Sequence, residues 1–195
     1  MTNQEIDQIM YDTAISEGFT PTAAKYVVAQ ARYESADYSS NVFKLNNNTS
    51  GMKFVGQPLA TKGTLAPYNE RSSSCRSSNI CANSDYYAKF KTIQDSASDK
   101  ISRNYNLTIR GVAPSQLKNA TSPEEFAHLL KLRGYYGSAE TTYALGIRAK
   151  LLKISVIEFY KNNRNTVNYT AFGIGLLGIG VGLYFMKKKG IIFKK

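Results

Sequence analysis

The sequence predicts a mainly helical α+β domain with a small β-hairpin lobe, followed by one transmembrane helix. Apolar residues recur at helical spacing near both ends of the region 1–160, as they do in helices that pack one face on a core. Apolar and polar residues alternate in its middle part, which indicates strands. A long uncharged stretch near the C-terminus is typical of a helix that crosses a bilayer. We therefore expect a folded domain over 1–160, a linker over 161–168, a transmembrane helix over 169–187 and a basic tail over 188–195.

The first two helices are predicted from apolar periodicity and from end signals. Residues 3–16 place apolar side chains at helical spacing, and Gly18 follows as a natural stop. Thr20 and Pro21 then form a pair that is typical of a helix N-terminus. We expect this second helix to run to about Ser35, with a buried face made of Ala24, Val27, Val28 and Ala31.

Glu34 is expected in the last turn of this second helix. The negative end of a helix dipole and apolar neighbours both disfavour an ionised carboxylate. A carboxylic acid that stays protonated near neutral pH is what a glycosidase uses as its general acid. The alternative interpretation is a solvated glutamate on a helix surface. The apolar face that ends at Ala31, three residues earlier, favours the catalytic interpretation.

Strand character is concentrated in the middle of the chain. Residues 36–50 are rich in turn formers, and 51–55 and 61–68 are short extended stretches. The strong alternation over 86–93 predicts a strand. Together with the polar loop 71–83, these segments predict a small sheet lobe with a long hairpin loop.

The cysteines and the histidine limit the metal and redox chemistry. Cys75 and Cys81 lie in the polar loop and are either a loop-closing disulfide, if the domain works outside a reducing compartment, or free thiols. One histidine, His128, does not complete a metal-binding pattern with them. We therefore expect no metal and no organic cofactor.

Helices are expected again after Gln94. One is predicted over 95–106. Ser122 and Glu125 form a capping-box pattern around Pro123, and we expect that helix to stop at Gly134. A last helix is expected over 140–161, with Tyr143, Leu145, Ile147, Leu151, Leu152, Ile154 and Phe159 among its apolar residues.

The charge is uneven. The formal net charge is +11, and the segment 161–195 contains basic residues but no acidic one. No recognisable nucleic-acid-binding module accompanies this charge, so nucleic acid is not an expected partner. An anionic membrane surface or an acidic polymer suits the charge better.

The C-terminal stretch has the features of a membrane anchor. No charged residue occurs between Arg164 and Lys187. As a helix this stretch spans roughly 27–33 Å, the thickness of a bilayer core. Tyr169 and Tyr184 suit the two interfaces. A buried helix of a soluble core is the alternative, but the many glycines would weaken it in water.

Two further expectations concern this anchor. Gly178 and Gly182 stand four residues apart, so helix–helix self-association within the bilayer is an open alternative. The N-terminal segment 1–5 has neither the basic nor the apolar region of a cleavable signal peptide. Because the uncharged stretch suits a bilayer core, we expect a lipid bilayer as a partner through 169–187.

The segment around Glu34 resembles a known enzyme family. Residues 29–35 read Ala-Gln-Ala-Arg-Tyr-Glu-Ser, and they are followed by Ser40, by the pair at 47–48 and by Gly-Met-Lys at 51–53. This order resembles peptidoglycan-cleaving N-acetylglucosaminidases of glycoside hydrolase family 73, the flagellar-muramidase and autolysin type. These enzymes carry Ala-Gln-Ala-x-x-Glu-Ser, a later serine, an asparagine pair and Phe-Gly-Ile-Lys.

The resemblance has departures. Ser50 replaces the family's phenylalanine, and Ala36 and Tyr38 replace two usual glycines, so a different turn is expected after the acid. Residues 126–143 resemble the family's late Gly-Tyr-Ala-Thr-Asp-x-x-Tyr block with a longer spacing. The resemblance implies a lysozyme-like fold with a sugar-binding groove between the helices and the β-lobe.

The resemblance also implies roles for individual residues. Glu34 would be the general acid, and Tyr135 the aromatic residue beside the cleavage site. Glu70 is the best candidate for the second carboxylate and Asp85 the next, with a solvated hairpin acid as the alternative for Glu70. The candidate substrate-binding residues are Ser40, Asn47, Asn48, Tyr143 and Asp85, and simple packing is the alternative for Tyr143.

The implied reaction is hydrolysis of a β-1,4 glycosidic bond in peptidoglycan glycan strands. A carboxylate pair about 6.5–9.5 Å apart gives inversion, whereas about 5–5.5 Å gives a covalent route. A lytic transglycosylase or a muramidase that uses Glu34 alone stays open as an alternative.

The location follows from the substrate, because cell wall lies outside the cytoplasm. We expect a membrane-anchored enzyme, either in a bacterial envelope or in the virion membrane of a membrane-containing bacteriophage, where virion proteins are further possible partners. The alternative from another class is a non-catalytic structural protein of a virion or envelope on a lysozyme-like scaffold.

Overall fold

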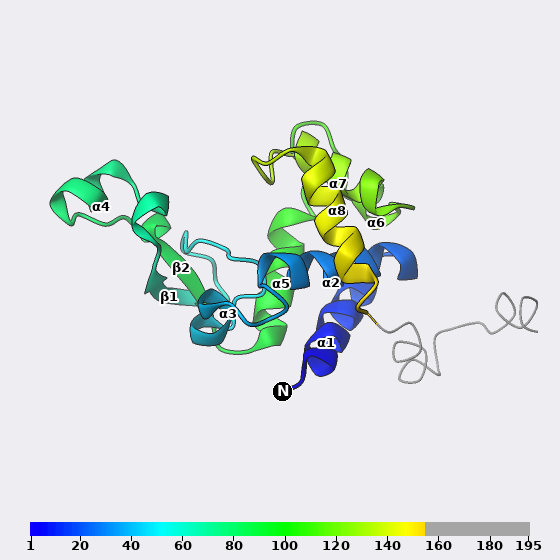
Figure 1. Ribbon diagram of the computed structural model, residues 1–195, viewed down its shortest axis with the longest axis horizontal. Helices are drawn as coiled ribbons and strands as arrows, with labels where there is room; N and C mark the ends of the chain where they lie inside the picture. Colours follow the sequence, from blue (N-terminus) through cyan, green and yellow to red (C-terminus); the bar gives the residue numbers. More distant parts are fainter. Residues whose placement is uncertain (155–195) are drawn as a thin grey trace, which may run out of the picture. The chain divides into compact units, whose positions relative to one another are not determined.

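The computed structural model describes residues 1–154. They form a mainly helical domain with one two-stranded antiparallel sheet (Figure 1), which confirms the predicted α+β class. The predicted linker, transmembrane helix and basic tail lie outside the described residues. Within residues 1–154, no helix has both the length and the apolar character that a membrane span requires.

The first two helices begin and end as their sequence signals predict. α1 covers Asn3–Ser16, and its N-terminus is capped by Thr2. α2 covers Pro21–Glu34, and the Thr20 hydroxyl accepts from the backbone N–H of Ala23. Gly18, between the helices, has a φ of 86° that favours glycine.

α2 is the centre of the helical core. It packs against α1, α7 and α8, and this explains why almost every residue from Ala23 to Arg32 is buried. The predicted face is buried in full, since Ala24, Val27, Val28 and Ala31 are each 0% exposed. A helix surrounded on several sides in this way delivers its last residue, Glu34, to a fixed position.

Within the described residues, four helices follow the sheet: α5 (Ile93–Asn104), α6 (Pro114–Lys118), α7 (Pro123–Leu132) and α8 (Glu140–Leu151). α5 begins two residues earlier than predicted, because Thr92 forms a capping box with Asp95. The Ser122 hydroxyl caps α7 as predicted, but the Glu125 carboxylate binds Thr121 instead of closing the capping box. The short helix α6 was not predicted.

The predicted end of the last helix at residue 161 is wrong. α8 ends at Leu151, and the next backbone bonds join residues three apart, from Lys153 to Lys150 and from Ile154 to Leu151. The ammonium groups of Lys150 and Lys153 both bind the Asp37 carboxylate, at 2.7 and 3.1 Å. This shared anion holds the tightened last turn against the end of α2.

The sheet consists of β1 (Ala60–Leu65) and β2 (Tyr86–Phe90), which pair antiparallel with an irregularity between Lys62 and Leu65. The strand predicted over 51–55 is reduced to an isolated bridge between Lys53 and Tyr87. Gly51 and Gly56 both have positive φ, at 63° and 85°, so the chain turns at each end of this short contact.

Stretches predicted as loops contain short helices. α3 covers Asn41–Asn46 and α4 covers Ser73–Ser78, while η1 (Tyr68–Glu70) and η2 (Asn83–Asp85) are single 3-10 turns. Both α3 and α4 start at a serine cap, Ser40 or Ser72, and end at a left-handed asparagine, Asn47 or Asn79. These cap residues are the local reason for helices in polar sequence.

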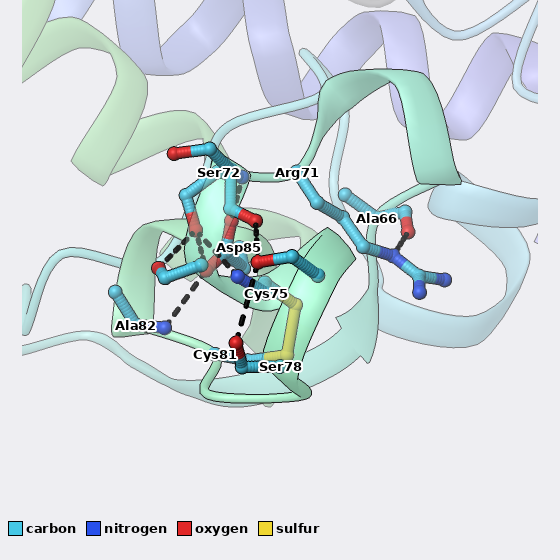
Figure 2. The surroundings of a disulfide bond; sticks show 11 residues. Ala66, Arg71, Ser72, Cys75, Ser78, Cys81, Ala82 and Asp85 are labelled. Atoms are coloured by element: carbon cyan, nitrogen blue, oxygen red, sulfur yellow. Dashed lines mark hydrogen bonds between the residues drawn. A yellow bond between two sulfur atoms is a disulfide. The ribbon is translucent and has the colours of Figure 1, made fainter.

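The hairpin between β1 and β2 carries α4 at its far end (Figure 1). A disulfide closes this end of the β-lobe. Cys75 and Cys81 are bonded with a Cα–Cα distance of 4.3 Å, so the pair left open by the sequence is a disulfide. Figure 2 shows Asp85 beside this bond, where its carboxylate accepts from the backbone and hydroxyl of Ser72 and from the N–H of Ala82.

The turn after Glu34 is left-handed over three consecutive residues. Ala36, Asp37 and Tyr38 have φ values of 52°, 54° and 61°, although none is glycine. The Tyr38 hydroxyl donates to Asp7 at 2.8 Å, and the Arg32 guanidinium binds the same carboxylate in a buried ion pair. These contacts hold a backbone conformation that costs about 1–2 kcal/mol per residue outside glycine.

We predict that Ala36→Gly stabilises the protein. Ala36 is exposed and left-handed, so glycine relieves strain and loses no packing. After the extra entropy that glycine gives the unfolded chain, the expected gain is about 0.5–1 kcal/mol, measured by thermal unfolding. Ala149→Gly removes the same methyl group from an exposed position inside α8 and should cost up to about 1 kcal/mol. An unchanged or lowered Tm for Ala36→Gly contradicts the inference that the backbone is strained at Ala36.

Candidate active site

A pocket of about 590 Å³ lies at the end of α2. Its walls come from segments that are far apart in the sequence: the turn at 50–52, the end of α5, the segment that follows α7, and α8. The residues that line it are Glu34, Ser50, Gly51, Met52, Asn104, Ile109, Arg133, Gly134, Tyr135, Tyr136 and Tyr143. The structure thus brings together three of the predicted site residues, Glu34, Tyr135 and Tyr143.

The carboxylate of Glu34 is held by several donors. Its Oε1 accepts from the Tyr143 hydroxyl at 2.5 Å and from the Gln30 amide at 3.1 Å. Its Oε2 accepts from the Tyr135 hydroxyl at 3.0 Å. The side chain is 14% exposed, so the carboxylate borders the pocket while most of the side chain is covered. The bond from the Tyr143 hydroxyl to this carboxylate is not explained by a role of Tyr143 in packing alone.

Gln30 links this carboxylate to the core. Its amide nitrogen also donates to the Tyr143 hydroxyl at 2.8 Å, and its carbonyl oxygen accepts from the buried hydroxyl of Tyr105. In the sequence, Gln30 stands out only as part of the motif at 29–35. Its position four residues before Glu34 puts both side chains on one helix face, and that spacing is the signal that could have found it.

Lys100 is a second residue that sequence reasoning missed. Its side chain is 0% exposed, and its Nζ lies 3.9 Å from Oε2 of Glu34. It falls on the buried face of α5 with Ile93, Ala97 and Ile101. A lysine in phase with an apolar helix face is the sequence signal, but only the packing of α5 reveals what it faces.

Tyrosine rings form one wall of the pocket. The rings of Tyr136 and Tyr143 stack with centroids 3.8 Å apart, and Tyr33 meets Tyr143 edge-on. Gly146 allows this contact, because a Cβ at that position would lie 2.3 Å from the Tyr33 ring. Burial, with help from the nearby Glu34 carboxylate, raises the pKa of Tyr143. The hydroxyl therefore stays protonated and remains a donor.

Burial also fixes the protonation of the other two tyrosines of the pocket wall. The pKa of Tyr135 is raised well above its ordinary value by burial and by the Glu34 charge. Burial, followed by the charge of Glu140, raises the pKa of Tyr136 to about 12. All these hydroxyls are neutral across the physiological range.

Three predicted substrate-binding residues form bonds within the protein instead of lining the pocket. The Ser40 hydroxyl caps α3, and the Asn47 amide donates to the carbonyl groups of Phe90 and Lys91. Asn48 is fully buried, and its side chain accepts from and donates to the backbone of Met52. Asn48 therefore shapes the 50–52 turn that lines the pocket.

The two candidate second carboxylates lie outside the residues that line the pocket. Glu70 Oε2 accepts from the Lys53 ammonium at 2.8 Å and from the Tyr87 hydroxyl at 2.7 Å. Burial works to raise the pKa of Glu70, but the bonds from Lys53 and Tyr87 outweigh it and the pKa is lowered. Glu70 is therefore a paired, ionised carboxylate on the lobe.

Asp85 caps backbone instead of facing the pocket. The backbone N–H of Ser72 contributes most to lowering the pKa of Asp85, against a smaller opposing effect of burial. Asp85 also lies close to Cys75 and Cys81 in the one three-residue group within residues 1–154 whose atoms are spaced like metal ligands. Because both sulfur atoms are in the disulfide, they do not offer the thiolates that bind metal.

Comparison with known proteins gives two solved structures of similar shape. One is a chain of a type VI secretion system effector–immunity complex from Pseudomonas protegens, 17% identical over 77% of this chain and 91% of that one, with a TM-score of 0.49. The other is the catalytic domain of the autolysin Auto from Listeria monocytogenes, 21% identical over 79% of this chain and 85% of that one, with a TM-score of 0.48. No protein-family profile and no curated protein matches the sequence.

We predict that Asp85→Asn destabilises the β-lobe. The asparagine amide offers one acceptor oxygen where the carboxylate uses two, so Tm falls. Because the folded-state pKa of Asp85 is lowered, its stabilisation is present above about pH 4 and is lost as pH falls further. Thermal unfolding at several pH values measures both effects. Asp12→Asn, at an exposed site in α1, is the control. Equal Tm shifts for both variants contradict the stabilising role of the Asp85 carboxylate.

Proposed function

We propose that the domain cleaves β-1,4 glycosidic bonds in peptidoglycan glycan strands, with Glu34 as the general acid. One observation carries the proposal: Glu34 is the only carboxylate among the described residues that line the pocket. Its position also matches the glutamate of the N-acetylglucosaminidase pattern that residues 29–35 resemble. The pocket volume lies within the range of ordinary ligand sites.

The hydrogen bonds suggest which oxygen of Glu34 holds the proton. Oε1 accepts from the Gln30 amide, which has no acceptor atom on its nitrogen, and from Tyr143. It therefore suits the carbonyl oxygen of a protonated acid. Among residues 1–154, Oε2 has one hydrogen-bonding partner, the Tyr135 hydroxyl, and a hydroxyl can accept as well as donate. We assign the catalytic proton to Oε2.

Proton transfer from Oε2 to the glycosidic oxygen would release the leaving sugar. The tyrosine wall provides apolar faces for sugar rings and keeps the acid aligned. The 2.5 Å bond from Tyr143 and the bond from Gln30 hold the carboxyl group in one orientation, which preserves the geometry that general acid catalysis needs.

A second candidate function is a lytic transglycosylase. The observation that favours it is the position of Glu70 and Asp85, which are paired on the lobe and do not line the pocket. In a transglycosylase, a hydroxyl of the sugar itself attacks the anomeric carbon, so one acid is sufficient. In a hydrolase, water attacks, and a second carboxylate from the lobe would direct it.

The location is proposed from the sequence. The stretch 169–187 would anchor the enzyme in a bacterial envelope or in the membrane of a virion, close to its wall substrate. Recovery of the full-length protein in the membrane fraction and in purified virions would support the virion form of this proposal. Recovery only in bacterial envelopes contradicts it.

We predict that Glu34→Gln strongly slows peptidoglycan cleavage without unfolding the protein. The amide keeps the shape of the carboxyl group but does not donate the proton, so the rate of fragment release from purified peptidoglycan should fall about 10²–10⁴-fold. Glu140→Gln, which changes a partly exposed glutamate paired with His128, is the matched control and should keep the wild-type rate.

Mass spectrometry of the released fragments separates the two reactions. Hydrolysis adds water and leaves reducing ends, whereas transglycosylation leaves anhydro ends that lack this water. The identity of the terminal sugar distinguishes a glucosaminidase from a muramidase. A Glu34→Gln variant that retains the wild-type rate refutes the role of Glu34, and a wild-type protein without any activity favours the non-catalytic scaffold.

A further inference from the structure

We propose that Lys100 is a positioning residue that sets the proton affinity of Glu34. Its buried ammonium lies beside Oε2 of Glu34, and an opposite charge this close favours the ionised form of a carboxyl group. The enzymatic part of this inference rests on the proposed function, whereas the electrostatic part concerns two side chains and does not depend on any activity.

The surroundings of Lys100 leave Glu34 as its compensating charge. The Lys100 side chain is fully buried, and Nζ has no hydrogen-bond partner within residues 1–154. A buried ammonium without an acceptor is costly. The Glu34 carboxylate, 3.9 Å from Nζ, is the one ion-pair partner of Lys100 in the described part of the chain.

The ammonium faces the oxygen that would hold the catalytic proton. Nζ lies near Oε2, which receives a single hydrogen bond from the described part of the chain, donated by Tyr135. Oε1, in contrast, is already occupied by Gln30 and Tyr143. A positive charge beside Oε2 opposes its protonation and stabilises the carboxylate that remains after the proton has been given to the substrate.

The other described groups around the Glu34 carboxylate keep their charge over the pH range in which a glutamate titrates. Tyr143 from α8, Tyr135 from the segment after α7 and Tyr105 from the end of α5 all have raised pKa values, chiefly because of burial. Arg133, whose charge also acts on Tyr105, donates to the carbonyl groups of Leu107 and Val112 and stays charged. Burial lowers the pKa of Lys100 to about 8, while Glu34 opposes this shift.

Lys100 is therefore charged below about pH 8, throughout the range in which a glutamate titrates. An opposite charge at this distance displaces the titration of a carboxyl group by about 1–3 pH units. Replacing Lys100 by a neutral side chain should move the midpoint of the Glu34 titration upward by that amount.

The test is a carboxyl titration of the full-length protein labelled with ¹³C-glutamate. NMR spectra across a pH series follow each glutamate, and loss of one signal in Glu34→Gln assigns Glu34. In Lys100→Met, which keeps the length of the side chain, the midpoint should rise by about 1–3 pH units. Lys118→Met removes a partly buried lysine on α6 that binds the carbonyl of Glu17, and it should leave the Glu34 midpoint unchanged.

An unchanged midpoint in Lys100→Met overturns the inference. Lys100→Gln is a second neutral variant if the methionine variant does not fold. The wild-type protein gives an additional readout, because loss of the Lys100 proton should shift the Glu34 signal in a small second step near pH 8. The absence of any such step at alkaline pH also overturns the inference.

The enzymatic readout separates failure of this inference from failure of the proposed function. If the wild type cleaves peptidoglycan and Glu34→Gln does not, the alkaline limb of its pH–rate profile should move upward in Lys100→Met by the same interval as the NMR midpoint. A limb that does not move, in an enzyme that needs Glu34, refutes the role of Lys100 alone. If no variant cleaves peptidoglycan, the NMR midpoints still decide the electrostatic claim.

Discussion

The hydrogen bonds that converge on the Glu34 carboxylate are the constraint on which the candidate site depends. Their donors come from three segments: Gln30 from α2 itself, Tyr143 from α8 and Tyr135 from the chain after α7. Because all three must reach one group, the end of α2 has to meet α8 and the end of α7. The pocket is therefore a product of tertiary packing around a single side chain.

The turn after Glu34 fixes the same helix end from the other side. Its three left-handed residues are held by the buried Asp7–Arg32 pair and by Tyr38. Asp37 in this turn binds two lysines at the end of α8. The same helix supplies Tyr143 to the site. Backbone strain next to a candidate catalytic residue is common, since surrounding contacts can maintain it. Here ion pairs hold the left-handed conformation at positions where glycine would adopt it without strain.

Local signals in the sequence predicted the elements that carry the site, and tertiary contacts decided the rest. Thr20 and Pro21 predicted the start of α2, and its apolar face predicted where Glu34 emerges. α3 and α4 were missed although Ser40 and Ser72 are good caps, because polar composition suggested loops. The contact of Lys100 with Glu34 joins residues of two helices, and no local pattern specifies such a distance.

The central claim is that the position of the Glu34 carboxyl group, and not only its presence, makes the site. Glu34→Asp tests it most directly, because aspartate keeps the acid but withdraws it by one methylene from Tyr135, Tyr143 and Gln30. A displacement of about 1 Å can cost about 10²-fold in rate. Peptidoglycan cleavage by this variant should fall by that order while Tm stays nearly unchanged. An aspartate variant that cleaves at the wild-type rate would contradict it.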